Sequence, residues 1–165
     1  MIILGIDPGL GVTGYGLVAV DGGKVRCVDF GGIYPASRAP LAEKLQRIYA
    51  GIKEVVEAYH PDAVAIEDIF YHENVKTAIV MGHARGVSIL AAQQAQVPVF
   101  EYSPREVKMS VGGSGAASKQ QVQAMVQTLL RLPELPRPFD AADALAVALC
   151  HFHRMKFQSL TSAAR

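Results

Sequence analysis

Two acidic residues stand at the ends of short apolar runs that read as buried strands. Asp7 follows residues 2–6, and Glu67 follows residues 63–66. In open α/β sheets, ligands bind in the crevice beyond the carboxyl ends of the strands. If these two strands are neighbours, Asp7 and Glu67 face a common site. Taken singly, Asp7 could instead bond to the amides of the following turn, and Glu67 could be a surface acid at a strand exit.

Two further acids, Asp140 and Asp143, are three positions apart in an alanine-rich run. That spacing places both carboxylates on one face of a helix, near its N-terminus. Asp140 alone could serve as an N-cap. Asp143 has Ala, Leu and Val as neighbours in a helix that reads as buried, where an unpaired charge costs several kcal/mol. Asp143 therefore needs a partner or a metal ion.

Together the four acids form an all-oxygen set of ligands. Such a set suits Mg²⁺ or Mn²⁺ and does not suit Zn²⁺. Two such ions about 3.5–4 Å apart can stabilise the attacking and leaving oxygens of a phosphodiester displacement. Repulsion among the carboxylates predicts a site that is unfavourable without metal. Asp68 competes with Glu67 for the same role, although it points to the opposite face if the strand continues.

The elements that must position these acids change from strands to alternating helices and strands. Asp-Gly-Gly at residues 21–23 separates two β-rich runs and predicts a hairpin, so the first three strands form an antiparallel meander. Later βα units require a parallel extension. The sequence predicts an α/β fold with a five-stranded mixed sheet flanked by helices. The expected strands are 2–7, 12–20, 24–33, 63–67 and 97–101, and the expected helices are about 40–59, 75–94, a short one after Ser103, 118–129 and 140–154.

Length and composition fit one compact domain. The chain has 165 residues, of which 50% are hydrophobic and 19% charged, and this composition excludes intrinsic disorder. We expect a single domain over residues 1–154 and a frayed tail at 155–165. Two cysteines are too few for a disulfide scaffold. The N-terminus does not read as a signal peptide, and no run approaches the about 20 apolar residues that span a bilayer, so we expect a cytoplasmic protein without membrane contact.

The net charge of +1 conceals an uneven distribution of charge. Residues 1–70 hold six basic and nine acidic side chains, whereas residues 71–165 hold ten and six. Such asymmetry points weakly to an anionic partner. Residues 102–131 contain four basic side chains and one acid, and Lys108 and Lys119 among them would suit phosphate neutralisation. Either lysine could instead belong to a solvated helix face.

Phe70 and Tyr71 form an aromatic pair directly after the strand that ends at Glu67. In a loop, such rings can stack on unpaired bases, at about 1–3 kcal/mol for each base. The alternative is ordinary packing of a loop end against the core.

A set of motifs, in order along residues 2–150, resembles the RuvC family of Holliday-junction resolvases. Each motif is weak alone, but the ordered set is highly specific. The motifs are ILGIDPG at 3–9, TGYG at 13–16, AIE at 65–67 with Phe70 and Asn74 after it, ARG at 84–86, VFEY at 99–102, VK at 107–108 and DAADALA at 140–146.

The resemblance implies a ribonuclease H-like fold and a homodimer that nicks two strands of like polarity in a four-way DNA junction, in homologous recombination and DNA repair. In that family, the acids matching Asp7, Glu67, Asp140 and Asp143 bind two Mg²⁺ ions per subunit, and we expect Mn²⁺ to substitute. Some members carry His at the position of Asp140. The resemblance also implies coupling to the branch-migration proteins RuvA and RuvB.

The resemblance also implies DNA contacts. The lysines matching Lys108 and Lys119 lie near the scissile phosphate and the DNA backbone, and we expect a catalytic role for Lys119. The aromatic residue matching Phe70 lies beside the junction centre. Tyr71 and Lys76 are further candidates for DNA contact. A dimer also needs an apolar surface, which we expect on the helix at 75–94 unless that face covers the sheet; its candidates are Val80, Met81, Val87 and Leu90.

Three other interpretations remain open. Residues 7–14 look like the phosphate loop of the actin and sugar-kinase group, where glycines let the backbone approach an anion, although 165 residues leave little room for the second domain of such enzymes. The chain could be a different nuclease of the same fold, acting on RNA or linear DNA. A junction-binding protein without activity is the third, and it leaves the four acids unexplained.

Overall fold

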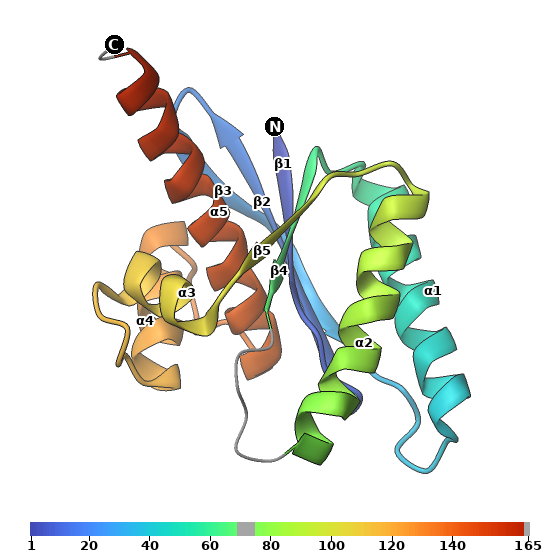
Figure 1. Ribbon diagram of the computed structural model, residues 1–165. Helices are drawn as coiled ribbons and strands as arrows, with labels where there is room; N and C mark the ends of the chain where they lie inside the picture. Colours follow the sequence, from blue (N-terminus) through green and yellow to red (C-terminus); the bar gives the residue numbers. More distant parts are fainter. Residues whose placement is uncertain (69–74, 164–165) are drawn as a thin grey trace.

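The structure is a computed structural model that describes residues 1–68 and 75–163. Over these ranges the chain forms five strands and five helices (Figure 1). The strands are β1 Ile2–Asp7, β2 Thr13–Asp21, β3 Lys24–Ile33, β4 Ala63–Glu67 and β5 Val99–Tyr102. The helices are α1 Leu41–Tyr59, α2 Val75–Gln94, α3 Pro104–Gly112, α4 Lys119–Leu130 and α5 Phe139–Ala163.

All five strands belong to one mixed sheet with the order β3-β2-β1-β4-β5. The first three strands are antiparallel, β4 runs parallel to β1, and β5 runs parallel to β4. The predicted hairpin between β2 and β3 turns at Gly22 and Gly23, whose φ angles of 52° and 79° suit glycine. The predicted mixed sheet is thereby confirmed.

Helices cover both faces of the sheet. α1 and α2 lie on one face, while α3, α4 and α5 lie on the other (Figure 1). Alternate residues of β1 point to opposite faces of the sheet. Leu4 and Ile6 pack in the cluster under α1 and α2, whereas Ile3 packs in the cluster under α5. Among the helices that the structure describes, none is long and apolar enough to cross a membrane.

Helix α5 lies in direct contact with the backbone of β1 and β2. A Cβ atom at Gly5 would lie 1.9 Å from the carbonyl oxygen of Ala144, and one at Gly14 would lie 2.0 Å from that of Asp140. At Gly16, a Cβ atom would lie 2.7 Å from Cγ of Leu145. Only glycine leaves room for this approach, so three glycines set the distance between α5 and the sheet.

Two helices begin with capping boxes, and the sequence predicted one of them. Ser118 and Gln121 cap α4 as expected, and Ser103 and Glu106 cap α3 in the same way. The Ser103 box has the same four-residue spacing and was recognisable, but it was not predicted. Both boxes lie close to candidate lysines and fix where those helices start.

The N-cap alternative for Asp140 and two predicted boundaries were wrong. α5 begins at Phe139, so Asp140 lies within its first turn and is not an N-cap residue. The same helix continues to Ala163 instead of fraying after Arg154, since residues 155–163 contain neither Gly nor Pro to end it. β5 starts at Val99, directly after Pro98, and lies at the sheet edge as its proline suggested. The domain boundary at residue 154 stays a prediction.

We expect Gly14→Ala to destabilise the protein by about 1–3 kcal/mol or more, because the new methyl group would overlap the backbone of α5. Urea unfolding would measure this loss. Gly86→Ala is the matched control, because a Cβ atom at Gly86 in α2 meets nothing within 4 Å, and alanine there should stabilise the helix by up to about 1 kcal/mol. Equal stability of the two variants would show that α5 does not depend on this contact.

Candidate active site

Asp7 and Glu67 end adjacent parallel strands at the same level. Ile6 of β1 pairs with Ile66 of β4, so the two acids that follow lie side by side at the sheet end. Both point toward α5, because residues two positions earlier do so: Gly5 touches α5, and Ala65 packs in the α5 cluster. The sequence left open whether these two strands are neighbours, and the structure shows that they are.

Asp140 and Asp143 reach the same sheet end through the first turns of α5. Gly14 pairs with Asp7 in the sheet, and the backbone of Asp140 lies directly over Gly14. The close approach of α5 thus brings its acidic turn to the end of β1. Side chains from β1, β4 and α5, which are distant in the sequence, therefore gather at one end of the sheet.

The pKa shifts of these acids show that their charges interact. Burial raises the pKa of Asp7 well above its ordinary value, and the negative charges of Glu67, Asp143 and Asp140 raise it further, in that order. Burial, followed by the charge of Asp143, raises the pKa of Glu67 to about 7. Burial raises the pKa of Asp143 as well. Without a cation, the site therefore opposes full ionisation.

Two lysines face this acidic site. Nζ of Lys119, the first residue of α4, lies 3.2 Å from Oδ2 of Asp143 and donates a hydrogen bond to it. The Lys119 side chain is 68% exposed while that of Asp143 is 20% exposed, so the lysine covers the acid from the solvent side. Lys119 and, to a lesser extent, Lys108 of α3 lower the pKa values of Glu67 and Asp143.

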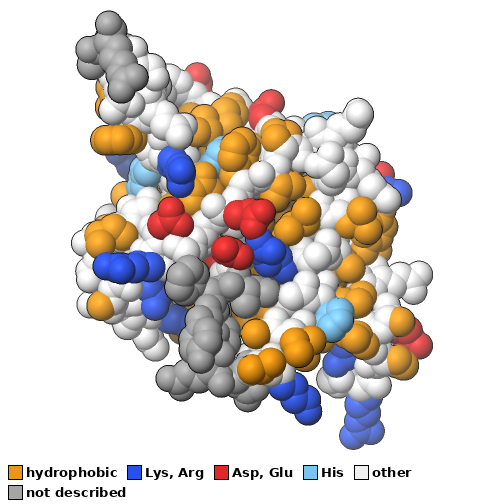
Figure 2. All heavy atoms as spheres, in the orientation of Figure 1, with side chains coloured by type: hydrophobic (Ala, Val, Ile, Leu, Met, Phe, Trp, Pro, Cys, Tyr) orange, Lys and Arg blue, Asp and Glu red, His pale blue; other side chains and the backbone are white. Residues whose placement is uncertain are grey.

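Asp68 is held away from the four acids. Its Oδ1 lies 3.2 Å from Nη2 of Arg85 on α2, on the opposite side of the sheet from α5. Arg85 also forms an ion pair with Glu101 of β5. Acidic and basic side chains lie together near the centre of the face drawn in Figure 2. Asp68 therefore points to the opposite face from Glu67, as the sequence suggested, although β4 ends at Glu67.

Three candidates for DNA contact lie in or beside residues 69–74. Phe70 and Tyr71 fall outside the residues that the structure describes, so the predicted stacking roles stay predictions. Lys76 is exposed in the first turn of α2. Its predicted contact with DNA also stays a prediction.

The donor chemistry fits a hard divalent cation. Four carboxylates at one end of the sheet supply oxygen ligands of the kind that Mg²⁺ and Mn²⁺ prefer. The arrangement is not a finished coordination sphere, because the described residues contain no group of three or more His, Cys, Asp or Glu side chains close enough to hold an ion. Lys119 holds Asp143, and like charges repel one another, so these side chains must turn toward an ion to bind it.

The loop after β1 is closed by its own hydrogen bonds. Oγ1 of the buried Thr13 donates to the carbonyl oxygen of Gly9 at 2.8 Å, and the Gly9 amide donates to Thr13 Oγ1 at 3.3 Å. A phosphate loop would present such an amide to its anion. The Gly9 amide is bonded within the loop, and it does not bond to Asp7 as an Asp-centred turn would require.

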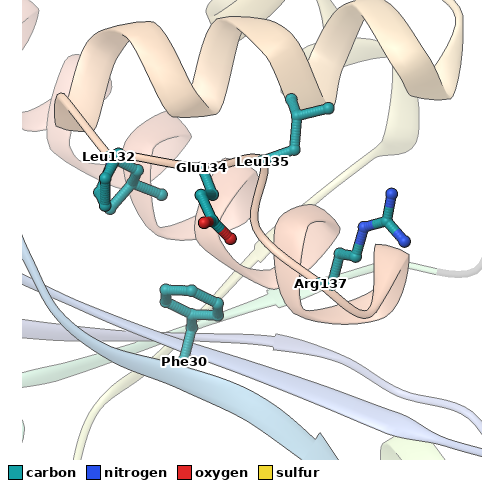
Figure 3. Close-up of a pocket in the computed structure, with 6 residues that line it drawn as sticks. Phe30, Leu132, Glu134, Leu135 and Arg137 are labelled. Atoms are coloured by element: carbon teal, nitrogen blue, oxygen red, sulfur yellow. The ribbon is translucent and has the colours of Figure 1, made fainter.

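A separate hollow lies between β3 and the segment that connects α4 to α5. Figure 3 shows its lining, with the Glu134 side chain turned toward Phe30 and with Arg137 at one side. None of the four acids lines this hollow. This hollow therefore gives no reason to move the candidate active site.

The sheet order, the acids at the ends of β1 and β4, and the acidic turn of α5 define a ribonuclease H-like protein. The sequence model of the family described as crossover junction endodeoxyribonuclease RuvC matches residues 3–151. The chain belongs to this family.

Individual relatives are similar over nearly their whole length. The crossover junction endodeoxyribonuclease RuvC of Alkaliphilus metalliredigens (strain QYMF) is 49% identical over 160 residues, which are 97% of this chain and 98% of that protein. A solved structure of Thermus thermophilus RuvC in complex with a Holliday junction substrate is 38% identical, with a TM-score of 0.89 over 96% of each chain. A yeast mitochondrial Holliday junction resolvase shares the fold, with a TM-score of 0.62 at 12% identity over 92% of this chain and 78% of that one.

We expect Glu67→Gln to stabilise the metal-free protein at pH 8 but not at pH 5. The folded protein keeps a proton on Glu67 up to about pH 7, whereas the unfolded chain loses it near the ordinary glutamate pKa of 4.5. Ionisation in the folded state therefore lowers stability as the pH rises through this interval, by up to about 3 kcal/mol. Urea unfolding in chelator at both pH values measures the difference.

The matched control for this experiment is Glu57→Gln, which changes an exposed acid of α1 that pairs with Lys53. Glu67→Gln should gain stability relative to this control only at the higher pH. A constant difference between the two variants from pH 5 to pH 8 would contradict the raised pKa of Glu67.

Proposed function

We propose that the protein resolves Holliday junctions as a divalent-metal-dependent endonuclease, using Asp7, Glu67, Asp140 and Asp143 as its metal ligands. Endonuclease activity on crossover junctions follows from the family to which the chain belongs. The observation that supports the site is the gathering of four electrostatically coupled carboxylates at the end of β1. Mg²⁺ is the expected ion, two per subunit, and Mn²⁺ should replace it.

Bound divalent ions would stabilise the attacking and leaving oxygens of the phosphodiester. The chain's own residues prepare the place for that chemistry. β1 and β4 hold Asp7 and Glu67 on rigid strand ends, and the capped α4 holds Lys119 over Asp143. Because Lys119 is largely exposed, its ammonium group is available to balance the charge of a DNA phosphate near the acids.

The test is cutting of a labelled synthetic four-way junction with Mg²⁺, with Mn²⁺ and with chelator. We expect paired symmetric nicks only with metal. Asp7→Asn should lower the cutting rate by more than about a hundredfold, which corresponds to about 3 kcal/mol of transition-state stabilisation. Asp68→Asn is the matched control, since Asp68 pairs with Arg85 away from the site, and it should keep metal-dependent cutting.

Other outcomes of this test would favour other functions. Cutting without metal, or full activity of Asp7→Asn, would contradict the proposed site. Equal cutting of linear duplex DNA or RNA would indicate a different nuclease of this fold. Tight binding of the junction without cutting, whichever metal is added, would indicate a junction-binding protein. ATP hydrolysis in place of cutting would support the kinase-like interpretation.

A homodimer would place two such sites on one junction, and the exposed face of α2 is the proposed contact. α2 buries only small residues against the sheet side, while Val75, Ile79 and Leu90 are 70%, 57% and 50% exposed. Figure 2 shows hydrophobic side chains along this part of the surface. Of the residues predicted for the dimer, Leu90 is exposed, whereas Val87 packs partly against the core. Coupling to RuvA and RuvB stays a prediction.

We expect the double variant Ile79→Arg/Leu90→Arg to be monomeric, because two charges in an apolar contact would be buried without partners. Sedimentation velocity over a range of protein concentrations would measure the change. Met125→Arg/Met109→Arg, which changes exposed apolar residues of α4 and α3, is the control and should leave the association state unchanged. A dimeric Ile79→Arg/Leu90→Arg protein would exclude α2 as the contact.

A further inference from the structure

Three basic side chains gather at the far end of α4 from the acidic site. Lys24 and Arg26 at the start of β3, and Arg131 after the last residue of α4, line one hollow. All three are exposed, and none takes part in an ion pair among the residues that the structure describes. Asp21 is the one acid that lines the hollow, so the basic charges outnumber it. We call the hollow that these three residues line the basic hollow.

Arg131 occupies a backbone position that normally favours glycine. It is the C-cap of α4, with φ 52° and ψ 43° in the left-handed region. Glycine is the usual residue in this conformation at the end of a helix, because a side chain is sterically disfavoured there. A charged side chain at this position offsets the negative end of the helix dipole, and it also points a cation into the hollow.

Helix α4 connects the acidic site to the basic hollow. Lys119 at its first residue bonds to Asp143, and Arg131 follows its last residue. The 12 residues of α4 span about 18 Å. The helix contains neither Asp nor Glu, in contrast to α1, which carries Glu43, Glu54 and Glu57.

The next acid beyond the helix, Glu134, lines a different hollow and is turned toward Phe30 (Figure 3). No acidic side chain of α4 therefore repels an anionic ligand that runs from Lys119 to Arg131. A long, regularly charged anion matches this surface better than a single phosphate would.

We propose that the basic hollow binds the phosphate backbone of one arm of the junction, leading away from the cutting site along α4. Duplex DNA advances about 3.4 Å per base pair, so a distance of about 18 Å places these contacts about five base pairs from the cut. The inference rests on the proposed function, and it adds a second contact region on the same DNA. Its role is affinity for the arm, and the chemistry stays with the acids.

The first experiment measures binding of a fluorescent junction in chelator, where cutting should not occur, over a range of salt concentrations. Arg26→Ala/Arg131→Gly should bind on the order of tenfold more weakly at 0.1 M salt, and the slope of log affinity against log salt should fall by about two. Arg131→Gly suits the left-handed C-cap, so thermal unfolding should show no loss of stability from it. The matched control, Arg47→Ala/Lys53→Ala, removes two positive charges from α1 on the other side of the sheet and should change neither quantity.

The second experiment places uncharged methylphosphonate linkages in each arm, either about five or about fifteen base pairs from the cut. The near linkages should weaken binding of the wild type but leave the Arg26→Ala/Arg131→Gly variant unaffected, and the distant linkages should affect neither protein. An unchanged salt slope in the variant, or equal weakening of both proteins by the near linkages, would overturn the inference. Such a result would leave the basic hollow as a surface for an acidic protein segment.

Cutting assays separate this inference from the proposed function. With Mg²⁺ and saturating protein, Arg26→Ala/Arg131→Gly should cut the junction at the wild-type rate, because the acids are intact. A wild type that binds the junction but never cuts it would contradict the proposed function and leave the arm contact standing. A variant that cuts slowly even at saturation would contradict the inference, since it would show that the basic hollow acts on more than affinity.

Discussion

The close contact of α5 with β1 and β2 is the constraint on which the rest of the structure depends. Gly5, Gly14 and Gly16 leave no side chain between the sheet and the helix, and alanines on α5 complete the contact. Replacing these small residues by larger ones, on the sheet or on α5, would move the helix outward by about the size of a methyl group. That movement would separate Asp140 and Asp143 from Asp7, because the backbone of Asp140 lies directly over Gly14, which pairs with Asp7. Packing and the active site thus share one geometry.

The gathering of acids carries an electrostatic cost that the fold only partly offsets. Burial and mutual repulsion raise the pKa values of Asp7, Glu67 and Asp143, while Lys119 lowers them in part. A divalent cation would relieve the repulsion among these carboxylates and favour their ionised form. Under the proposed function, Lys119 on α4 and a metal ion would compete for the same oxygen atoms of Asp143. Arg85 holds Asp68 away from these acids by pairing with it on the other side of the sheet.

The near-neutral net charge of +1 describes the surface poorly. Nine of the acids lie in residues 1–70, and α1, on the face away from α4, carries several of them. Lys108, Lys119 and Arg131 lie on the other face or at its edge, with α4 itself free of acids. A DNA-binding protein needs positive charge only where the phosphates run, and the excess of acids elsewhere leaves that local attraction largely intact at physiological salt because screening is strong beyond about 8 Å.

The sequence by itself predicted the elements and the acidic residues of the candidate site. The glycine hairpin, the strands ending in Asp7 and Glu67, the capping box at Ser118 and the pair Asp140/Asp143 are local patterns, and local patterns depend on neighbouring residues alone. Only the tertiary structure decided that Asp68 pairs with Arg85, that Lys119 covers Asp143 and that cations from β3 and the end of α4 share a hollow. Each of these depends on contacts between elements far apart in the chain, and the distances between such elements follow from packing, which periodicity and spacing do not encode.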